Sequence, residues 1–409
     1  MKILVLSQVF YPDNVSVAQH LADLCFNLAK KGHEVNVITS RYPYEEKNIK
    51  YSSYEKVNNV IIKRIWSTGF GKKIIVSRLL DFISFNFSIF INLALIKKRS
   101  YDLIIGLTAP PLISFIGALL AKKKMIKFCY WIMDMQPELA IHSGFIKKNS
   151  FLAKILTKLG RSTLNNSDKI IVLDRFMKKY LVESLCVSED KIEIAPVWPV
   201  IDNIYLQNRL ENPFRVENNF GDKIVIMYSG NHSFVHQLDT LLNLSRTLKE
   251  DKRFIFVFIG GGVRKKEVTE FKNKFCLENI VQLSYQPREK IHLSLGSSDI
   301  QVVILGDGLV GFTHPNKIYG ALFIGKPIIY IGPSKSHISE ILLKLSGNIL
   351  VNHSEIKELK EKLLNLCDDF SKVEAIGKKN QEFAYKYFSP ELLINKMCYD
   401  IESVTPYGQ

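Results

Sequence analysis

The chain has 409 residues, of which 47% are hydrophobic and 23% charged. This composition excludes a disordered or low-complexity chain, because such chains carry too few apolar side chains to offset the entropy of ordering. The length suffices for two domains. The six cysteines are scattered and no two have C-x-x-C spacing, which argues against a disulfide framework or a zinc ribbon. The apolar run at the start, residues 1–7, is too short for a signal peptide, so we expect a cytoplasmic protein.

The positive charge is concentrated in the first half of the chain. The formal net charge is +15. Residues 1–200 hold 29 Lys and Arg against 16 Asp and Glu, a balance of +13, whereas residues 201–409 hold 26 against 24, a balance of +2. This asymmetry indicates an anionic partner for the first half: nucleic acid, an acidic lipid surface or a phosphorylated carrier. A genome that favours lysine would explain the total but not its distribution.

Twelve short apolar runs predict strands buried on both faces of parallel sheets. They are residues 2–7, 34–39, 102–107, 126–132, 169–173 and 191–195 in the first half, and 223–228, 254–259, 279–284, 299–305, 327–331 and 347–351 in the second. Amphipathic helical stretches such as 18–30 lie between them. The alternation predicts two doubly wound α/β domains, joined by a linker at 196–222, with a ligand cleft at the carboxyl ends of the strands.

Residues 79–96 depart from this alternation. They are largely apolar and lie between basic residues at 72–73, 78 and 97–99. Their polar residues form one stripe at helical spacing: Asp81, Ser84, Ser88 and Asn92. A spanning helix would hold Asp81, Asn86 and Asn92 in hydrocarbon, each at a cost of about 1–3 kcal/mol or more, so such a helix is disfavoured. We expect a helix that lies in the membrane interface, and a helix packed on the sheet is the alternative.

In the first half, the candidate site residues follow strands. Asp134 comes directly after the strand at 126–132, where functional groups of open α/β sheets lie. Glu138 follows Pro137 and falls in the first turn of a helix, where a carboxylate also suits the helix dipole. The turn at 10–18, which includes Asp13 and Ser16, contains no glycine. A Rossmann-type NAD or FAD site is therefore not expected there.

In the second half, glycines follow three strands. Gly230 and Gly260–Gly262, the latter followed by Arg264, let a ligand approach the backbone. The strongest cluster spans 306–320, with four glycines, Pro315 suited to the first turn of a helix, and Lys317. Backbone amides and one ammonium group predict a diphosphate site. The chain has no D-x-D sequence, so we expect no magnesium-clamped nucleotide.

Nine short motifs occur in this order along the chain: Tyr11-Pro-Asp13, Thr108-Ala-Pro-Pro111, Asp134-x-x-Pro-Glu138, Leu173-Asp-Arg-Phe-Met177, Tyr228-Ser-Gly-Asn-His232, Phe258-Ile-Gly-Gly-Gly262, Tyr285-Gln-Pro-Arg288, His314-Pro-Asn-Lys317 and Gly325-Lys-Pro-Ile-Ile-Tyr330. Together they resemble the family-4 retaining glycosyltransferases of the GT-B fold, in the branch that makes bacterial lipopolysaccharide, capsule or exopolysaccharide.

The resemblance implies two facing Rossmann-like domains with a cleft between them. Residues 1–200 would bind the acceptor and carry the membrane-associating helix, residues 201–385 would bind the nucleotide-sugar donor, and a helix in 386–409 would return to the first domain. Asp134 and Lys317 are the candidate catalytic residues, with Asp13, Ser16 and Glu138 on the acceptor side. Donor contacts are implied for Gly230, Asn231, His236, Arg264, Tyr285, Gln286, Thr313, His314, Pro315, Asn316 and Tyr319.

The resemblance further implies a UDP-, GDP- or dTDP-sugar donor, no cofactor and no metal, and a lipid-linked or polysaccharide acceptor at the inner face of the cytoplasmic membrane. Nucleic acid is not an expected partner. Where the family places two glutamates, this chain has Phe312 and Gly320. Two alternatives therefore stay open: a non-hydrolysing sugar-nucleotide epimerase, and a non-catalytic subunit that presents a lipid carrier.

Overall fold

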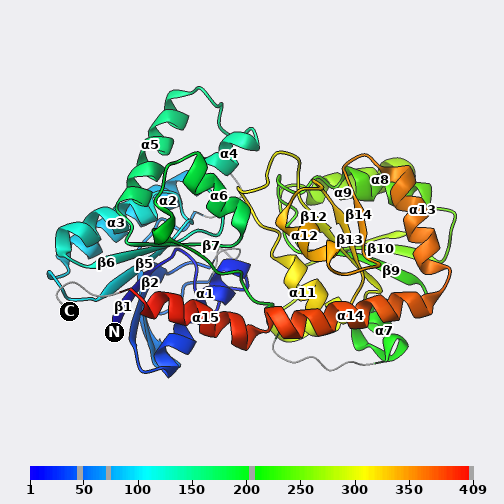
Figure 1. The fold of residues 1–409 in the computed structure, drawn as a ribbon, viewed down its shortest axis with the longest axis horizontal. Helices are drawn as coiled ribbons and strands as arrows, with labels where there is room; N and C mark the ends of the chain where they lie inside the picture. Colours follow the sequence, from blue (N-terminus) through cyan, green and yellow to red (C-terminus); the bar gives the residue numbers. More distant parts are fainter. Residues whose placement is uncertain (44–48, 71–74, 202–207, 405–409) are drawn as a thin grey trace. The chain divides into compact units, whose positions relative to one another are not determined.

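A computed structural model describes residues 1–43, 49–70, 75–201 and 208–404 (Figure 1). The chain divides into two compact units. The first comprises residues 1–197, 311–313 and 393–409, and the second comprises residues 198–310 and 314–392. Each unit is a sheet with helices on both of its faces (Figure 1).

The first unit contains an eight-stranded sheet in the order β3-β4-β2-β1-β5-β6-β7-β8. Its strands are β1 (Lys2–Leu6), β2 (Glu34–Ser40), β3 (Tyr54–Val57), β4 (Val60–Ile65), β5 (Leu103–Leu107), β6 (Lys127–Trp131), β7 (Lys169–Val172) and β8 (Ile192–Ile194). Its helices are α1 (Ser16–Lys30), α2 (Ile75–Leu95), α3 (Ile113–Lys124), α4 (Glu138–His142), α5 (Phe151–Asn165), α6 (Arg175–Glu183), the 3-10 turn η1 (Glu189–Lys191) and, from Leu393 on, α15 (Pro390–Glu402). All described pairs are parallel except β3 with β4.

The second unit contains a six-stranded parallel sheet in the order β11-β10-β9-β12-β13-β14. Its strands are β9 (Ile224–Ser229), β10 (Phe254–Ile259), β11 (Ile280–Leu283), β12 (Ile300–Ile304), β13 (Ile328–Ile331) and β14 (Ile349–Val351). Its helices are α7 (Pro213–Glu217), α8 (Asp239–Thr247), α9 (Lys265–Phe275), α10 (Ile291–Gly296), α11 (Lys317–Phe323), α12 (His337–Leu343), α13 (Ile356–Cys367) and α14 (Phe370–Phe388), with 3-10 turns η2 (Arg209–Glu211) and η3 (Arg288–Lys290).

The sheet of the second unit is covered on both faces, as its continuous apolar strands predict. Alternate residues of β9 and β10 enter two separate apolar clusters. Ile226 and Phe256 belong to one cluster, and Val225 and Val257 to the other. Two buried cores thus hold the carboxyl ends of these strands in fixed positions, and the loops that follow them carry most of the predicted donor residues.

All twelve predicted strands are confirmed. Two further strands, β3 and β4, were not predicted. β3 and β4 form a hairpin around Asn58 and Asn59, both in the left-handed conformation. Each contains two adjacent charged residues, Glu55 and Lys56 in β3 and Lys63 and Arg64 in β4. They therefore lack the continuous apolar run used to find the other strands.

The predicted linker at 196–222 is wrong over most of its described length. From Trp198 on, the chain belongs to the second unit, and Phe214 and Phe220 are buried in one of its apolar clusters. The guanidinium of Arg215 donates to the Ser297 carbonyl (2.7 Å) and to the buried carboxylate of Asp299 (3.2 Å). Within this segment, Asn212 and Asn218 cap the two ends of α7, and Pro213 is its first residue.

Helix α2 packs on the first unit through its polar stripe. The Asp81 carboxylate accepts from the Thr68 hydroxyl (2.6 Å) and the Phe70 amide (2.8 Å). Asn86 Nδ2 donates to the Pro111 carbonyl (2.9 Å). Buried alongside these polar residues are Phe85, Ile89 and Leu93. The exposed face is apolar and includes Leu79, Leu80, Ile83, Phe87, Phe90, Ile91 and Leu95.

The alternative of a helix packed on the unit is thus confirmed for one face of α2, and contact of the exposed apolar face with a membrane stays a prediction. By length and composition alone, residues 76–95 of α2 could cross a membrane. The predicted basic flank at Lys72 and Lys73 lies outside the described residues.

Candidate donor and acceptor sites

Lys317 is the centre of the candidate site in the second unit. It is the first residue of α11, and its ammonium nitrogen is buried without a hydrogen-bond partner. Nζ lies 3.4 Å from the centre of the Tyr228 ring, where a cation–π contact stabilises the ammonium. Burial holds the pKa of Lys317 well below its usual value. An unpaired buried ammonium gains strongly from an anionic partner, so this position suits a phosphate.

Glycines keep the backbone open around this ammonium. A Cβ atom on Gly230, whose φ is +130°, would lie 3.5 Å from Lys317 Nζ. A Cβ on Gly260 (φ +132°) would lie only 2.1 Å from the Gly230 carbonyl oxygen. The loops after β9 and β10 can therefore touch only because both positions lack a side chain. The strand ends thus bring Gly230 and Lys317 together, as the sequence predicts.

Two histidines share this end of the sheet. His236 Nδ1 lies 2.9 Å from the Ile304 carbonyl oxygen, and burial lowers its pKa. His232 is buried, with Nε2 unpartnered. Burial, and then the Lys317 charge, lower the pKa of His232 to about 4. Both rings are therefore neutral at pH 7, and neither competes with Lys317 as a cation. Asn231, which lies between Gly230 and His232 in the sequence, is exposed.

Three other predicted donor residues lie on loops of the same unit. Arg264 is held by protein groups: it bonds the Glu267 carboxylate (2.7 Å) and the His236 carbonyl (2.9 Å). Tyr285 is 41% exposed and its hydroxyl lies 3.4 Å from the Gly261 carbonyl oxygen. Gln286 donates to the Ser284 carbonyl (3.0 Å). Tyr285 thus offers an exposed ring for a base, whereas Arg264 supports the loop after β9.

The residues before α11 are more enclosed than the sequence suggests. Pro315 lies two residues ahead of the helix, not in its first turn, because α11 begins only at Lys317. His314 and Tyr319 are buried and stacked at 5.5 Å between ring centres. Asn316 Oδ1 is buried without a partner. Asn316 and Lys317 therefore present unsatisfied polar atoms in this segment, while His314 and Tyr319 form its packed base.

In the first unit, Asp134 lies beyond the end of β6, and the structure brings it together with Thr313. The Thr313 hydroxyl donates to Asp134 Oδ1 (2.6 Å), and the two residues form an isolated antiparallel bridge. Phe312, at one position of the missing glutamates, is stacked on the His142 ring (4.2 Å). Gly320, at the other, lies inside α11. An aromatic packing contact thus replaces one carboxylate, and the other position has no side chain.

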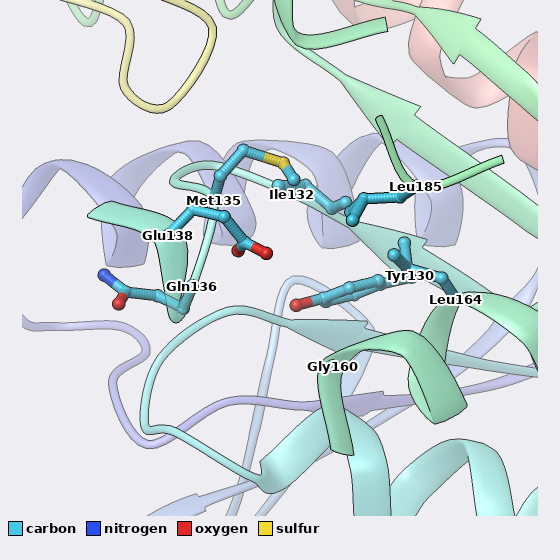
Figure 2. A pocket seen from close by; sticks show the side chains of 8 residues that line it. All are labelled: Tyr130, Ile132, Met135, Gln136, Glu138, Gly160, Leu164 and Leu185. Atoms are coloured by element: carbon cyan, nitrogen blue, oxygen red, sulfur yellow. The ribbon is translucent and has the colours of Figure 1, made fainter. Parts of the chain in front are cut away.

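Glu138 is the first residue of α4 and is buried. Its carboxyl group and the Tyr130 hydroxyl point into one small cavity, which Gln136 and Met135 also line (Figure 2). Burial raises the pKa of Glu138. Asp13 lies on the turn after β1, 3.4 Å from the Tyr51 hydroxyl, and Ser16 contacts His20 Nδ1 (3.2 Å) at the start of α1. These residues lie after different strands of one sheet, on its carboxyl side.

Comparison with known proteins shows what the chain resembles. The model of Glycosyltransferase Family 4 matches residues 17–197, which lie in the first unit. Over this part, the chain is similar to the family-4 glycosyltransferases. The chain is also 25% identical over 364 residues to the Escherichia coli protein WcaI, whose name assigns it to colanic acid biosynthesis as a glycosyl transferase. The alignment covers 85% of this chain and 87% of WcaI.

Solved structures identify the fold of the chain. Sucrose-phosphate synthase from Thermosynechococcus elongatus matches with a TM-score of 0.77 and 15% identity, over 99% of each chain. HepE from Anabaena, solved with UDP-glucose, matches with a TM-score of 0.71 and 13% identity, over 98% of this chain and 100% of HepE. The chain therefore has the predicted GT-B fold, with two parallel-sheet domains.

Sequence analysis missed two side chains at the candidate donor site. Tyr228 was quoted at a strand end and in a motif but given no role, yet its ring lies under the Lys317 ammonium. His232 was quoted in a motif but given no role, and its Nε2 is buried without a hydrogen-bond partner among the described residues. A histidine two residues after a glycine at a strand end was the available indication.

Proposed function

We propose that the protein is a retaining, metal-independent glycosyltransferase of bacterial cell-surface glycan synthesis. It would move a hexose from a UDP-, GDP- or dTDP-sugar to a lipid-linked or polysaccharide acceptor. The family supports sugar transfer. The name of WcaI, which refers to colanic acid, supports a cell-surface glycan, and the UDP-glucose bound to HepE supports a nucleotide-sugar donor.

The unpaired ammonium of Lys317 carries this proposal. Its nitrogen lies over the Tyr228 ring and beside Gly230, where a diphosphate could reach it and the free backbone of the β9 loop. As the sugar leaves, negative charge grows on the diphosphate. A fixed cation in a dry site stabilises that charge more strongly than water would. Lys317 would thus serve in place of a metal ion.

The transfer would occur on one face of the sugar. The acceptor oxygen forms a bond to the anomeric carbon while the bond from that carbon to the phosphate oxygen breaks. The departing phosphate oxygen takes the proton of the acceptor hydroxyl, so no enzyme-linked intermediate is needed. Asp134 would orient the acceptor hydroxyl, with Asp13, Ser16 and Glu138 around it, while the loops of the second unit hold the donor.

The acceptor side would lie at the inner face of the cytoplasmic membrane. The first half of the chain carries a charge of +13 by residue count, and α2 exposes an apolar face beside Lys97, Lys98 and Arg99. A helix with exposed apolar residues and basic neighbours binds anionic bilayers in their interface. The enzyme would therefore be cytoplasmic and peripherally attached, within reach of a lipid-linked acceptor.

Calorimetric titration with UDP and GDP tests the donor site. Lys317→Ala should weaken the binding free energy of the nucleotide that binds more tightly, UDP or GDP, by about 1.5–3 kcal/mol, the range for a charge-assisted contact. Lys335→Ala, which removes an exposed lysine from the same unit, should bind normally. EDTA should have no effect. Equal binding by Lys317→Ala and the native protein, or loss of binding in EDTA, would refute the proposed site.

A panel of nucleotide sugars separates the alternatives left open by Phe312 and Gly320. Transfer or slow hydrolysis of one donor supports the proposal. Interconversion of two free nucleotide sugars would indicate the epimerase instead. A protein that binds none of the panel would fit the non-catalytic subunit, because it would lack a donor site.

A further inference from the structure

A second exposed apolar group lies in the first unit, away from α2. It comprises Phe145, in the turn after α4, and Phe151, Leu152 and Ile155, in the first turns of α5. Phe151 is 79% exposed, Phe145 59% and Leu152 54%. Exposing several large apolar side chains so close in sequence is costly in water and marks a contact surface.

The charged residues of this segment are all basic. Lys147 and Lys148 precede α5, and Lys154 and Lys158 lie on its exposed side, one and two turns from Phe151. Residues 139–167 contain no Asp or Glu. We call residues 145–158 the α5 segment.

The neighbouring helices α2 and α3 have no exposed acidic residue in the part of the chain that the structure describes, since Asp81 of α2 is buried. Helix α3 contacts both α2 and α5 (Figure 1). From residue 82 to 167, a stretch described throughout, the acidic residues are Asp102, Asp134 and Glu138, and none of them is exposed. Exposed basic residues across α2, α3, α5 and their flanks are Arg78, Lys97, Lys98, Arg99, Lys122, Lys123, Lys147, Lys148, Lys154, Lys158 and Arg161.

We propose that the α5 segment is a second membrane-insertion site, which binds a bilayer rich in anionic phospholipid together with α2. This deepens the membrane attachment proposed above and rests on it. Charge complementarity selects the partner: an entirely basic surface with protruding phenylalanines matches anionic headgroups over hydrocarbon. Two insertion sites on one helical layer would restrict how the first unit can rotate on the membrane, which one amphipathic helix cannot do.

Tryptophan placed in the α5 segment reports insertion directly. In the full chain, Phe151→Trp is combined with Trp66→Phe, so that the other tryptophans, Trp131 and Trp198, are buried. Vesicles contain equimolar phosphatidylglycerol and brominated phosphatidylcholine, whose bromines quench tryptophan within the hydrocarbon. The matched control is Leu343→Trp in the same background, because Leu343 is an equally exposed (72%) apolar residue of the second unit.

We expect strong quenching of Phe151→Trp and little quenching of Leu343→Trp. In co-sedimentation, Phe151→Ser with Leu152→Ser should weaken binding by at least about tenfold, from lost apolar burial. Lys154→Glu with Lys158→Glu should weaken it mainly at low salt, and Lys378→Glu with Lys379→Glu, in the second unit, should not. A circular dichroism spectrum identical to that of the native protein shows that each variant is folded.

The outcomes separate this inference from the proposed function. If α2 variants lose binding while Phe151→Trp is quenched no more than Leu343→Trp, the second site is refuted and membrane attachment through α2 stands. If no variant or native protein sediments with vesicles, both membrane proposals fail, while UDP binding still tests the donor site. A change in oligomeric state of Phe151→Ser with unchanged lipid binding would identify a second copy as the partner instead.

Discussion

At the residue scale, the two candidate catalytic residues, Lys317 and Asp134, differ in whether other groups of the protein form hydrogen bonds with them. Lys317 has a buried nitrogen that lies over a ring and has no hydrogen-bond partner among the described residues, whereas Asp134 accepts a hydrogen bond from Thr313. A group left unpaired in a packed interior costs stability unless a ligand supplies its partner. Lys317 is therefore the residue whose environment depends most on substrate, and Asp134 is already oriented.

Asp134→Asn should reduce transfer by about 100-fold or more while leaving nucleotide affinity unchanged. The amide keeps the shape and can still accept from Thr313, but it lacks the charge that would act on the acceptor hydroxyl. Turnover and UDP titration measure the two effects separately. The control is Asp190→Asn, an exposed position of the same unit. Loss of UDP affinity in Asp134→Asn would assign this carboxylate to the donor.

His232 should make stability depend on pH. Its pKa is lowered from 6.5 to about 4 by burial and by Lys317, so between these values the unfolded chain binds a proton that the folded chain does not. The free energy of unfolding should thus fall by up to about 3 kcal/mol as pH drops from about 6.5 to 4. His236, whose pKa is also lowered, adds to this trend, and Glu138, whose pKa is raised, opposes it.

Urea unfolding at several pH values measures the effect. His232→Gln should flatten the pH dependence between about 6.5 and 4. His292→Gln, on α10 of the same unit, is the control. A slope that His232→Gln leaves unchanged would mean that His232 takes up its proton in the folded protein as readily as in the unfolded chain.

At the element scale, helix α2 shows what periodicity can and cannot predict. The spacing of Asp81, Ser84 and Ser88 correctly predicted a helix with one polar stripe. It did not predict that the stripe would face inward. Asp81 of the stripe is bonded to Thr68 and Phe70, and Asn86, beside the stripe, to Pro111. These partners lie 11 to 25 residues away on loops after β4 and β5. Only the assembled sheet brings them to the helix.

The same limit applied elsewhere in the fold. Continuous apolar strands were predictable because burial on both faces leaves a strong local pattern. The β3–β4 hairpin and the folded segment at 209–217 depend on non-local partners, such as Asp299 for Arg215. They were therefore not predicted from the sequence. At the site, glycines after strands correctly marked the loop positions, but the contact of Lys317 with Tyr228 joins residues far apart in sequence.

Variants of α2 should separate its two faces. Phe87→Ser with Phe90→Ser removes exposed rings and should release the protein from anionic liposomes even at high salt, because apolar burial does not depend on ionic strength. Lys97→Glu with Lys98→Glu should weaken binding chiefly at low salt, since each basic residue contributes about 1 kcal/mol that salt screens. Sedimentation across a salt series measures both.

The buried face provides the contrast. Phe85→Ser, at a fully buried position, should lower the free energy of unfolding by about 3–5 kcal/mol. If this variant instead folded normally and lost lipid binding, α2 would present the opposite face to the membrane.

At the scale of the whole molecule, one tryptophan should report docking. Trp66 is 58% exposed, while Trp131 and Trp198 are 1% and 2% exposed. Trp66 lies beside the loop whose residues Thr68 and Phe70 are bonded to α2. The fluorescence emission of Trp66 should shift to shorter wavelength when anionic vesicles are added. Neutral vesicles at low lipid concentration should cause no shift. Trp66→Phe should abolish the shift. A shift that survives this substitution would come from a change at the buried tryptophans.

The exposed apolar face of α2 also bears on how the enzyme would find its acceptor. An attached enzyme and a lipid-linked acceptor share one leaflet, so their encounter becomes a search in two dimensions at a raised effective concentration. The apparent KM for the acceptor would then follow its mole fraction among the lipids rather than its amount per volume of suspension. Diluting the leaflet with inert phospholipid would slow the reaction even with enzyme and acceptor both held constant in the tube.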